Sequence, residues 1–281
     1  MKLFAIMSGI IFLFAACATA QTEKEAQTNL SNREKVVALL TSIETGDPKP
    51  VSYINPNKYI QHNLMVGDGL AGFGEVMKQL PEGNAKARVV RAFQDGDYVF
   101  AHTEYNFFGP KIGFDIFRFE DGLIVEHWDN LQEIAPKNPS GRTQIDGPTE
   151  ATDLDKSDAN KALVKGFVRD VLKGANPGRI TEYISPEKYL QHNPAVADGL
   201  DPLGKALEAM AKAGTPMVYT ENHMILGEGN FVLSVSEGNF LGNHVAFYDL
   251  FRIEHAKIIE HWDTIEEIPA KDKWMNNNGK F

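Results

Sequence analysis

The chain has 281 residues, of which 43% are hydrophobic and 23% charged, proportions typical of a folded protein with one large or two small domains. Lys and Arg total 28 against 38 for Asp and Glu, so the formal charge is −10. An acidic surface repels phosphate backbones and argues against nucleic acid as a partner. The single cysteine excludes an internal disulfide and a cysteine-rich zinc site.

The first 20 residues have the pattern of a signal peptide. Lys2 precedes an apolar run over 3–16, and Ala18-Thr19-Ala20 forms a small-residue cleavage site. The run is shorter than the ~20 residues that a membrane-spanning helix needs. We therefore predict a periplasmic or secreted protein without a membrane span. Cleavage before Cys17 would instead give a lipoprotein, and in either case Cys17 is not a catalytic nucleophile.

Helices are predicted at the start of the chain that follows. Ser31 or Asn32 can cap an amphipathic helix that Gly46 closes. A second helix is predicted over 70–80, and strands follow over 87–94, 98–108, 112–120 and 123–130, separated by Asp-Gly and Gly-Pro turns. Helices followed by an antiparallel meander indicate an α+β fold.

The same succession occurs twice. Residues 53–63, which end in Gln-His-Asn, return as 183–193; 115–120 return as 249–254, and 124–129 as 258–263. Such a long period indicates a duplicated domain. Residues 136–156 are rich in Pro, Gly, Ser, Thr and Asp and are predicted to be a linker. We predict a domain over 30–135, a second over 157–270 and a tail over 271–281.

The repeated motifs resemble the SnoaL-like family, within the superfamily of nuclear transport factor 2, ketosteroid isomerase and scytalone dehydratase. They are Tyr-x-Gln-His-Asn, Asp-x-Phe-Arg-x-Glu and Ile-x-Glu-His-Trp-Asp. The resemblance implies two cone-shaped α+β barrels, each with helices packed on a curved, mainly antiparallel sheet around a pocket. Family members include isomerases, dehydratases and aldol-type cyclases that use no cofactor, and also binding or scaffold domains, so the fold does not select an activity.

The resemblance and strand alternation together predict the pocket-facing residues. Matching the Asp-x-x-Arg-Phe segment of ketosteroid isomerases places Asp115 inward. The other inward positions are then Phe117 on the same strand, His127 and Asp129 on the next, and Phe100, His102 and Glu104 on the strand before. His62 and Asn63 fall where those isomerases carry the general base, and Tyr59 can reach the pocket rim.

Imidazole and carboxyl groups in an apolar pocket suit removal of an acidic C–H proton. The candidate catalytic residues are His62, His102, His127 and Asp115. The candidate substrate-binding residues are Tyr59, Asn63, Phe100, Glu104, Phe117 and Asp129. Their equivalents in the second copy are His192, Asn193, Asp249, His261 and Asp263.

The second copy has Val235 where the first has His102, so the first copy is the better candidate for an active site. His223 and His244 have no counterpart in the first copy; they either compensate for the missing imidazole or are exposed. Trp128 and Trp262 face away from the pocket in this register and are expected to pack between the domains. The two domains would then form an intramolecular pseudo-dimer, with further oligomerisation open.

The sequence therefore predicts an exported enzyme that uses acid/base side chains and no cofactor. The expected reaction is proton abstraction next to a carbonyl or carboxylate, as in a dehydratase or isomerase. Export favours a small substrate, either carbohydrate-derived, such as a sugar or uronic acid, or an environmental carbonyl compound. The alternatives are a non-catalytic ligand-binding or scaffold protein, purely structural roles for the histidines, and zinc binding, for which no motif of close spacing is present.

Overall fold

The computed structural model describes residues 30–81 and 83–281. They form two five-stranded sheets with helices packed against each, so the predicted α+β class is confirmed. The predicted signal peptide and Cys17 lie outside the described residues. None of the helices in the described part of the chain is both long enough and apolar enough to span a bilayer.

Local signals define the first helix, α2 (Asn32–Thr45). The Ser31 side chain accepts a hydrogen bond from the Glu34 backbone N–H, and the Glu34 carboxylate accepts one from the Ser31 N–H, which is a capping box. Gly46 ends the helix in the left-handed conformation, with φ of 70°. The other elements of the first domain are η1 (Lys49–Tyr53), β1 (Ile60–Gln61), α3 (Gly69–Gln79), β2 (Lys86–Asp95), β3 (Tyr98–Asn106), β4 (Pro110–Glu120) and β5 (Leu123–Glu133).

The second domain repeats this order with one change in its first helix. Whereas α2 is α-helical throughout, α4 (Ser157–Phe167) continues as one π-helical turn, η3 (Val168–Leu172). The remaining elements are η2 (Leu154–Lys156), η4 (Pro177–Arg179), α5 (Ile180–Tyr183), β6 (Leu190–Gln191), α6 (Leu200–Lys212), β7 (Val218–Glu228), β8 (Phe231–Phe240), β9 (Asn243–Glu254), β10 (Lys257–Glu267) and η5 (Lys271–Lys273).

The strand orders of the two sheets correspond, being β1-β5-β4-β3-β2 and β6-β10-β9-β8-β7. Four strands of each form the predicted antiparallel meander. The sequence did not predict the two-residue strands β1 and β6, which pair in parallel with the last strand of their meander. This pairing aligns Gln61 with His127, and Gln191 with His261.

Each sheet has one face against its own helices and one against the other domain. In the first domain Asp115 is paired with Ala101 and Asp129, so these residues share a face. Ala101 and Phe117 belong to the core that includes the buried residues of α2, which identifies this as the inner face. The opposite face packs against the second domain through one apolar cluster, which includes Phe93, Phe100, Trp128, Phe231, Tyr248 and Trp262.

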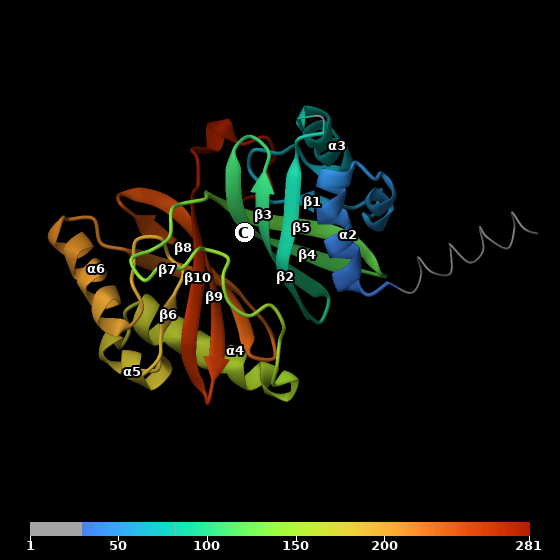
Figure 1. Ribbon diagram of the computed structural model, residues 1–281. Coiled ribbons are helices and arrows are strands. Elements are labelled where there is room, and N and C mark those ends of the chain that lie inside the picture. Colours follow the sequence, from blue (N-terminus) through green and yellow to red (C-terminus); the bar gives the residue numbers. More distant parts are fainter. Residues whose placement is uncertain (1–29, 82) are drawn as a thin grey trace, which may run out of the picture.

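The contact between the domains has approximate two-fold symmetry. The Gln94 N–H donates to Glu228 (2.7 Å), and the Gly227 N–H donates to Asp95 (2.9 Å). Asn130 donates to the backbone oxygen of Thr264, its counterpart in the repeat (2.9 Å). Reciprocal contacts of this kind characterise an isologous interface. Figure 1 shows the two sheets side by side, with α2 and α3 beside the first and α4, α5 and α6 beside the second.

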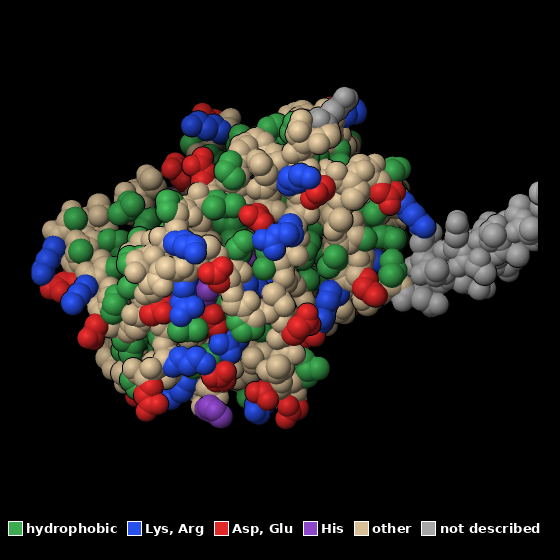
Figure 2. Space-filling model, viewed as in Figure 1, with side chains coloured by type: hydrophobic (Ala, Val, Ile, Leu, Met, Phe, Trp, Pro, Cys, Tyr) green, Lys and Arg blue, Asp and Glu red, His purple; other side chains and the backbone are tan. Residues whose placement is uncertain are grey.

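Charges are mixed over the surface in view. On the face in Figure 2, Lys and Arg side chains alternate with Asp and Glu side chains over both domains. This face therefore presents no extended basic stripe of the kind that follows a nucleic-acid backbone.

Candidate active site

A cluster of two aspartates and a histidine lies on the inner face of the second domain. His261 Nε2 is 3.0 Å from Asp249 Oδ1, and His261 Nδ1 is 2.9 Å from Gln191 Oε1. Asp263 Oδ2 accepts a hydrogen bond from Asn193 Nδ2 (2.7 Å), whereas Asp263 Oδ1 is buried and has no partner among the described residues. These three residues, Asp249, His261 and Asp263, are here called the second-domain cluster.

The first domain holds an equivalent cluster of Asp115, His127 and Asp129. His127 Nε2 is 3.5 Å from Asp115 Oδ1, and its Nδ1 is 3.1 Å from Gln61 Oε1. Asn63 Nδ2 donates to Asp129 Oδ2 (2.7 Å). Phe117 stacks on the His127 ring (4.5 Å). The structure thus brings together the predicted residues of β4 and β5 with Asn63, and Tyr59 lies in the same core.

Three predicted site residues lie on the wrong face of the sheet. Phe100, His102 and Glu104 were expected in the pocket, but Ala101 is the residue paired with Asp115, so these three point the other way. His102 is buried between the domains and stacks on Phe114 (4.2 Å). Burial, together with the charges of Arg91 and His192, lowers the pKa of His102 well below 6.5.

This correction removes the reason for preferring the first copy. His102 was regarded as an extra proton-transfer group that the second copy replaces by Val235. Because Val235 belongs to the cluster between the domains, neither residue faces a pocket. Glu104 instead forms an ion pair with Arg88 on the neighbouring strand (2.6 Å).

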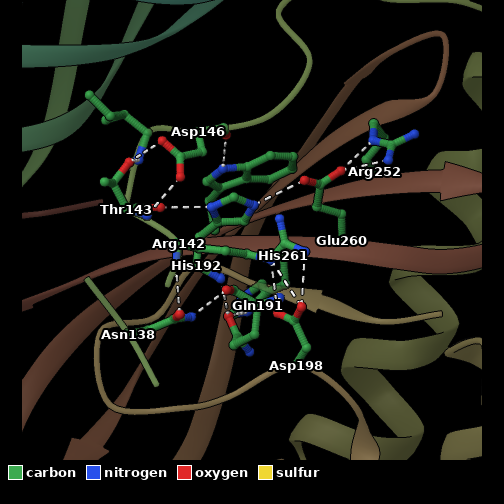
Figure 3. A network of polar contacts seen from close by, with 12 residues as sticks. Asn138, Arg142, Thr143, Asp146, Gln191, His192, Asp198, Arg252, Glu260 and His261 are labelled. Atoms are coloured by element: carbon green, nitrogen blue, oxygen red, sulfur yellow. Dashed lines mark hydrogen bonds and ion pairs between the residues drawn. The ribbon is translucent and has the colours of Figure 1, made fainter. Parts of the chain in front are cut away.

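His62 and His192 are also outside the pocket. The His192 ring stacks on Trp262 (4.6 Å); its Nδ1 lies 2.7 Å from the Thr143 carbonyl oxygen and its Nε2 2.9 Å from Glu260, which in turn pairs with Arg252. Figure 3 shows this network around the segment 138–146. His192 therefore fixes the linker to the second domain and, contrary to its predicted position, does not line the cavity.

The chain end repeats this arrangement on the first domain. His62 stacks on Trp128 (4.6 Å), its Nδ1 lies 2.9 Å from the Gly279 carbonyl oxygen, and its Nε2 lies 2.9 Å from Glu126. Asn276 and Asn138 occupy equivalent places, since each donates to two backbone oxygens of the domain it covers. We call residues 138–143 the linker clasp and residues 276–280 the tail clasp.

A cavity of about 410 Å³ opens above the second-domain cluster. Its polar groups come from the cluster itself, from Gln191 and Asn193, and from the hydroxyls of Tyr189 and Tyr219. Its other walls are mainly apolar and include Phe167, Leu203, Leu207, Met210, Met217, Phe240 and Phe251. An apolar pocket with a few converging polar groups is the usual form of a small-molecule site.

Burial and charge shift the acidities in this cavity. Burial alone lowers the pKa of His261, but the hydrogen bond with Asp249 and the charges of Asp263 and Asp249 outweigh it, so the pKa is raised above 6.5. Burial raises the pKa of Asp263 above 3.8, against the opposing charge of His261, and the charge of Asp249 adds to the rise. Burial also raises the pKa of Tyr219 well above 10, so its hydroxyl stays protonated.

Two kinds of residue at these clusters were not predicted. Gln61 and Gln191 orient the imidazoles, and their occurrence in both copies of the Gln-His-Asn motif was a signal for them. Tyr105 and Tyr219 bind the equivalent carboxylates Asp115 and Asp249 but come from different strands, β3 and β7. No comparison of the two copies could have identified this pair of tyrosines.

Each cluster also has donor atoms that a metal ion could share. One ligand atom from each of its three residues lies within 4.8 Å of the others. In the second domain, however, Asp249 is already bonded to His261 and Tyr219, so two of its acceptor positions are used within the protein.

The sequence was also compared with known proteins. No family model matches it. No curated protein matches it. Among solved structures, TsrD from Streptomyces laurentii is 22% identical over 34% of this chain and 82% of its own, with a TM-score of 0.29. IdmH from Streptomyces antibioticus, proposed to be a polyketide cyclase, is 19% identical over 37% of this chain and 93% of its own, with a TM-score of 0.33.

A third similar structure is an NTF2-like protein of unknown function from Cytophaga hutchinsonii. It is 16% identical over 37% of this chain and 92% of its own, with a TM-score of 0.33.

Proposed function

We propose that the second-domain cavity is an acid/base active site that works without a cofactor. It would remove a proton from a carbon next to a carbonyl or carboxylate, followed by loss of water or a double-bond shift. The observation that supports this most directly is Asp263, which lines the cavity and whose buried Oδ1 has no hydrogen-bond partner among the described residues. A buried carboxylate with a raised pKa is a suitable proton acceptor.

The hydrogen bonds of Gln191 indicate which atoms of His261 and Asp249 carry hydrogens. Gln191 Oε1 accepts the backbone N–H groups of His192 and Asn193, at 2.9 and 3.0 Å, so this atom is the amide oxygen. His261 Nδ1 must therefore carry a hydrogen to bond to it. The contact between His261 Nε2 and Asp249 then requires one further proton, which the two groups share. The raised pKa of His261 favours the imidazolium form, in which Nε2 donates to Asp249.

In the proposed elimination or isomerisation, each of the polar groups at the cavity has a separate role. Asp263 Oδ1 takes the proton from carbon, and the electron pair moves toward the substrate carbonyl. The Tyr189 hydroxyl accepts a hydrogen bond from Gln191 Nε2 (3.5 Å) and keeps its own proton for the developing oxyanion. The proton shared by His261 and Asp249 can pass to a departing hydroxyl, which leaves as water.

The cavity walls favour a substrate with an apolar body. Leucine, methionine and phenylalanine side chains form most of the lining, and the polar groups converge at the cluster. We therefore propose a small carbonyl or carboxylate compound whose apolar part faces α6. Carbohydrate-derived compounds, which were favoured only by predicted export, have hydroxyl groups that this lining does not match.

One observation favours a second candidate function, that of a non-catalytic binding protein. Both ring nitrogens of His261 are within hydrogen-bond distance of protein groups, which leaves the imidazole no position for a ligand. In that case the cavity would hold the same class of compound without turning it over.

The chain provides a matched test of these two functions. Asp263→Asn changes the proposed base, and Asp129→Asn makes the same change at its counterpart in the first domain. Carbonyl compounds and sugar acids would be screened with the full protein, with mass spectrometry to detect isomers or the loss of one water. We expect Asp263→Asn to reduce turnover at least a hundredfold and Asp129→Asn to preserve it. Ligand binding by the wild type with no product would support the binding protein instead.

We also propose export, with the pair of domains acting as one fused dimer. The support for export is the leader pattern alone. Expression of the whole gene in a Gram-negative host, followed by fractionation and mass measurement of the mature N-terminus, would test it. A mature chain that begins at Gln21 would support a soluble exported protein, whereas a lipid-modified Cys17 would support the lipoprotein alternative. Retention of the leader in the cytoplasm would contradict both.

A further inference from the structure

A second group of titratable side chains lies on the sheet face opposite the cavity. Glu221 and His223 come from β7 and Glu237 from β8, and one ligand atom from each of these residues lies within 4.8 Å of the others. His223 Nε2 is 3.0 Å from one carboxylate oxygen of Glu237, and His244 Nε2 is 2.7 Å from the other. The side chains of His223 and Glu237 are 22% and 27% exposed, so solvent ions can reach them.

The equivalent position in the first domain carries an ordinary ion pair between neighbouring strands. There Glu104, the counterpart of Glu237, is paired across the strands with Arg88, and the two side chains form an ion pair at 2.6 Å. In the second domain the residue paired with Glu237 is Glu221. Like charges on opposed strand positions destabilise a sheet, so this exchange has a cost that some other cation must offset.

No lysine or arginine among the described residues supplies that charge. The ion pairs of Glu237 there are with His223 and His244, and none involves Glu221. Two carboxylates and two imidazoles therefore share one surface site.

We propose that Glu221, His223 and Glu237 bind a divalent transition-metal ion, with zinc the best match to this set of ligands. Imidazole nitrogen and carboxylate oxygen are common zinc ligands at about 2.0–2.2 Å. Two ligands of one ion are then at most about 4.4 Å apart, so side-chain rotation must close the widest pair by a few tenths of an ångström. His244 holds the second oxygen of Glu237 and acts as an outer-shell partner.

The site also contacts the chain end. The Phe281 ring stacks on the His223 imidazole, with centroids 3.9 Å apart and planes within 5°. The neighbouring Lys280 belongs to the tail clasp on the first domain. A metal that fixes His223 would therefore also hold the tail against the second domain, so the ion would join β7, β8 and the chain end. This role is independent of the cavity, which opens on the other face of the sheet.

Zinc titration of the chelator-treated full chain by isothermal calorimetry tests the proposal. We expect one equivalent per chain for the wild type. Glu221→Arg restores the arrangement of the first domain, in which an arginine faces the glutamate, so this variant should fold yet bind zinc at least tenfold more weakly. His223→Gln should do the same, and His244→Ala should weaken binding about tenfold to a hundredfold. Circular dichroism would verify that each variant is folded.

Two control variants separate this site from other histidines. His255→Asn changes a histidine in the turn between β9 and β10, and His261→Gln changes the cavity cluster; both should retain one equivalent. The proposal is overturned if the wild type binds no zinc, if affinity is unchanged in both Glu221→Arg and His223→Gln, or if His261→Gln is the variant that loses the ion. The last result would assign the ion to the cavity cluster.

Discussion

The interface between the domains should determine the stability of the whole chain. Phe231 is fully buried, and its ring stacks on Phe93 of the other domain with centroids 4.5 Å apart. Truncation of a buried phenylalanine to alanine costs about 3–5 kcal/mol, and the stacked pair places Phe231 in the upper part of that range. We therefore expect Phe231→Ala to lower the free energy of unfolding by about 4 kcal/mol.

Calorimetry and urea denaturation measure this loss. In a chain of this size each kcal/mol shifts the Tm by roughly 2–4 °C, so the variant should melt about 8–16 °C below the wild type. Because Phe231 contacts both domains, we expect a single transition in both proteins. Phe108→Ala is the matched control: the same substitution at a side chain that is 61% exposed should change the free energy by less than about 0.5 kcal/mol.

Two outcomes would refute this reasoning. One is a pair of transitions in the variant, with one domain still melting at the wild-type temperature, because the domains would then be independent. The other is a shift no larger than that of Phe108→Ala, because the ring contact across the interface would then contribute little to stability.

Three further predictions concern the clasps and the cavity. Asn138→Ala and Asn276→Ala should each cost about 2–3 kcal/mol in urea denaturation, because each leaves two backbone oxygens without their donor. Because the pKa of His261 is raised above 6.5, its stabilising contribution is complete below that pH and is lost as the pH rises through the folded-state pKa. The difference in unfolding free energy between wild type and His261→Gln should therefore shrink as the pH rises above about 6.5, and a constant difference would contradict the shift. Leu203→Phe introduces into the cavity wall the larger residue that the first domain has at the equivalent position, Phe73. This variant should bind ligand at least tenfold more weakly, while its free energy of unfolding changes by less than about 1.5 kcal/mol.

Local signals predicted most of the architecture. The cap at Ser31, the glycine at position 46 and the Asp-Gly turns are short-range features, and the elements that they delimit end within a few residues of the predicted bounds. The prediction of pocket-facing residues failed on β3. Residues 99–103 of that strand are all buried, since it packs against helices on one side and the other domain on the other. A strand buried on both faces loses its alternating pattern, so only the pairing of Ala101 with Asp115 reveals its orientation.

The histidines of the Gln-His-Asn motif illustrate a second limit. Their repetition in both copies indicated a shared role, but His62 and His192 serve as anchors for segments that lie far along the chain. The sequence contains the repeated Asn and Gly of these segments, at positions 138 and 141 and again at 276 and 279. Their partners depend on how the domains pack, which no local periodicity encodes. The motif histidines of the last strands, His127 and His261, are the ones on the inner face.

The two clasps also place different charges near the two clusters. Among the described residues neither Asp263 Oδ1 nor Asp129 Oδ1 has a hydrogen-bond partner, and the basic residue of the linker clasp, Arg142, pairs with Asp198 (2.9 Å). In the tail clasp Lys280 donates to the Asp129 backbone oxygen (2.9 Å), and its ammonium lies 3.9 Å from Asp129 Oδ1. The first-domain aspartate therefore has an ammonium group beside it, whereas no ion pair is formed by Asp263 among the described residues, in the domain where the cavity opens above the cluster.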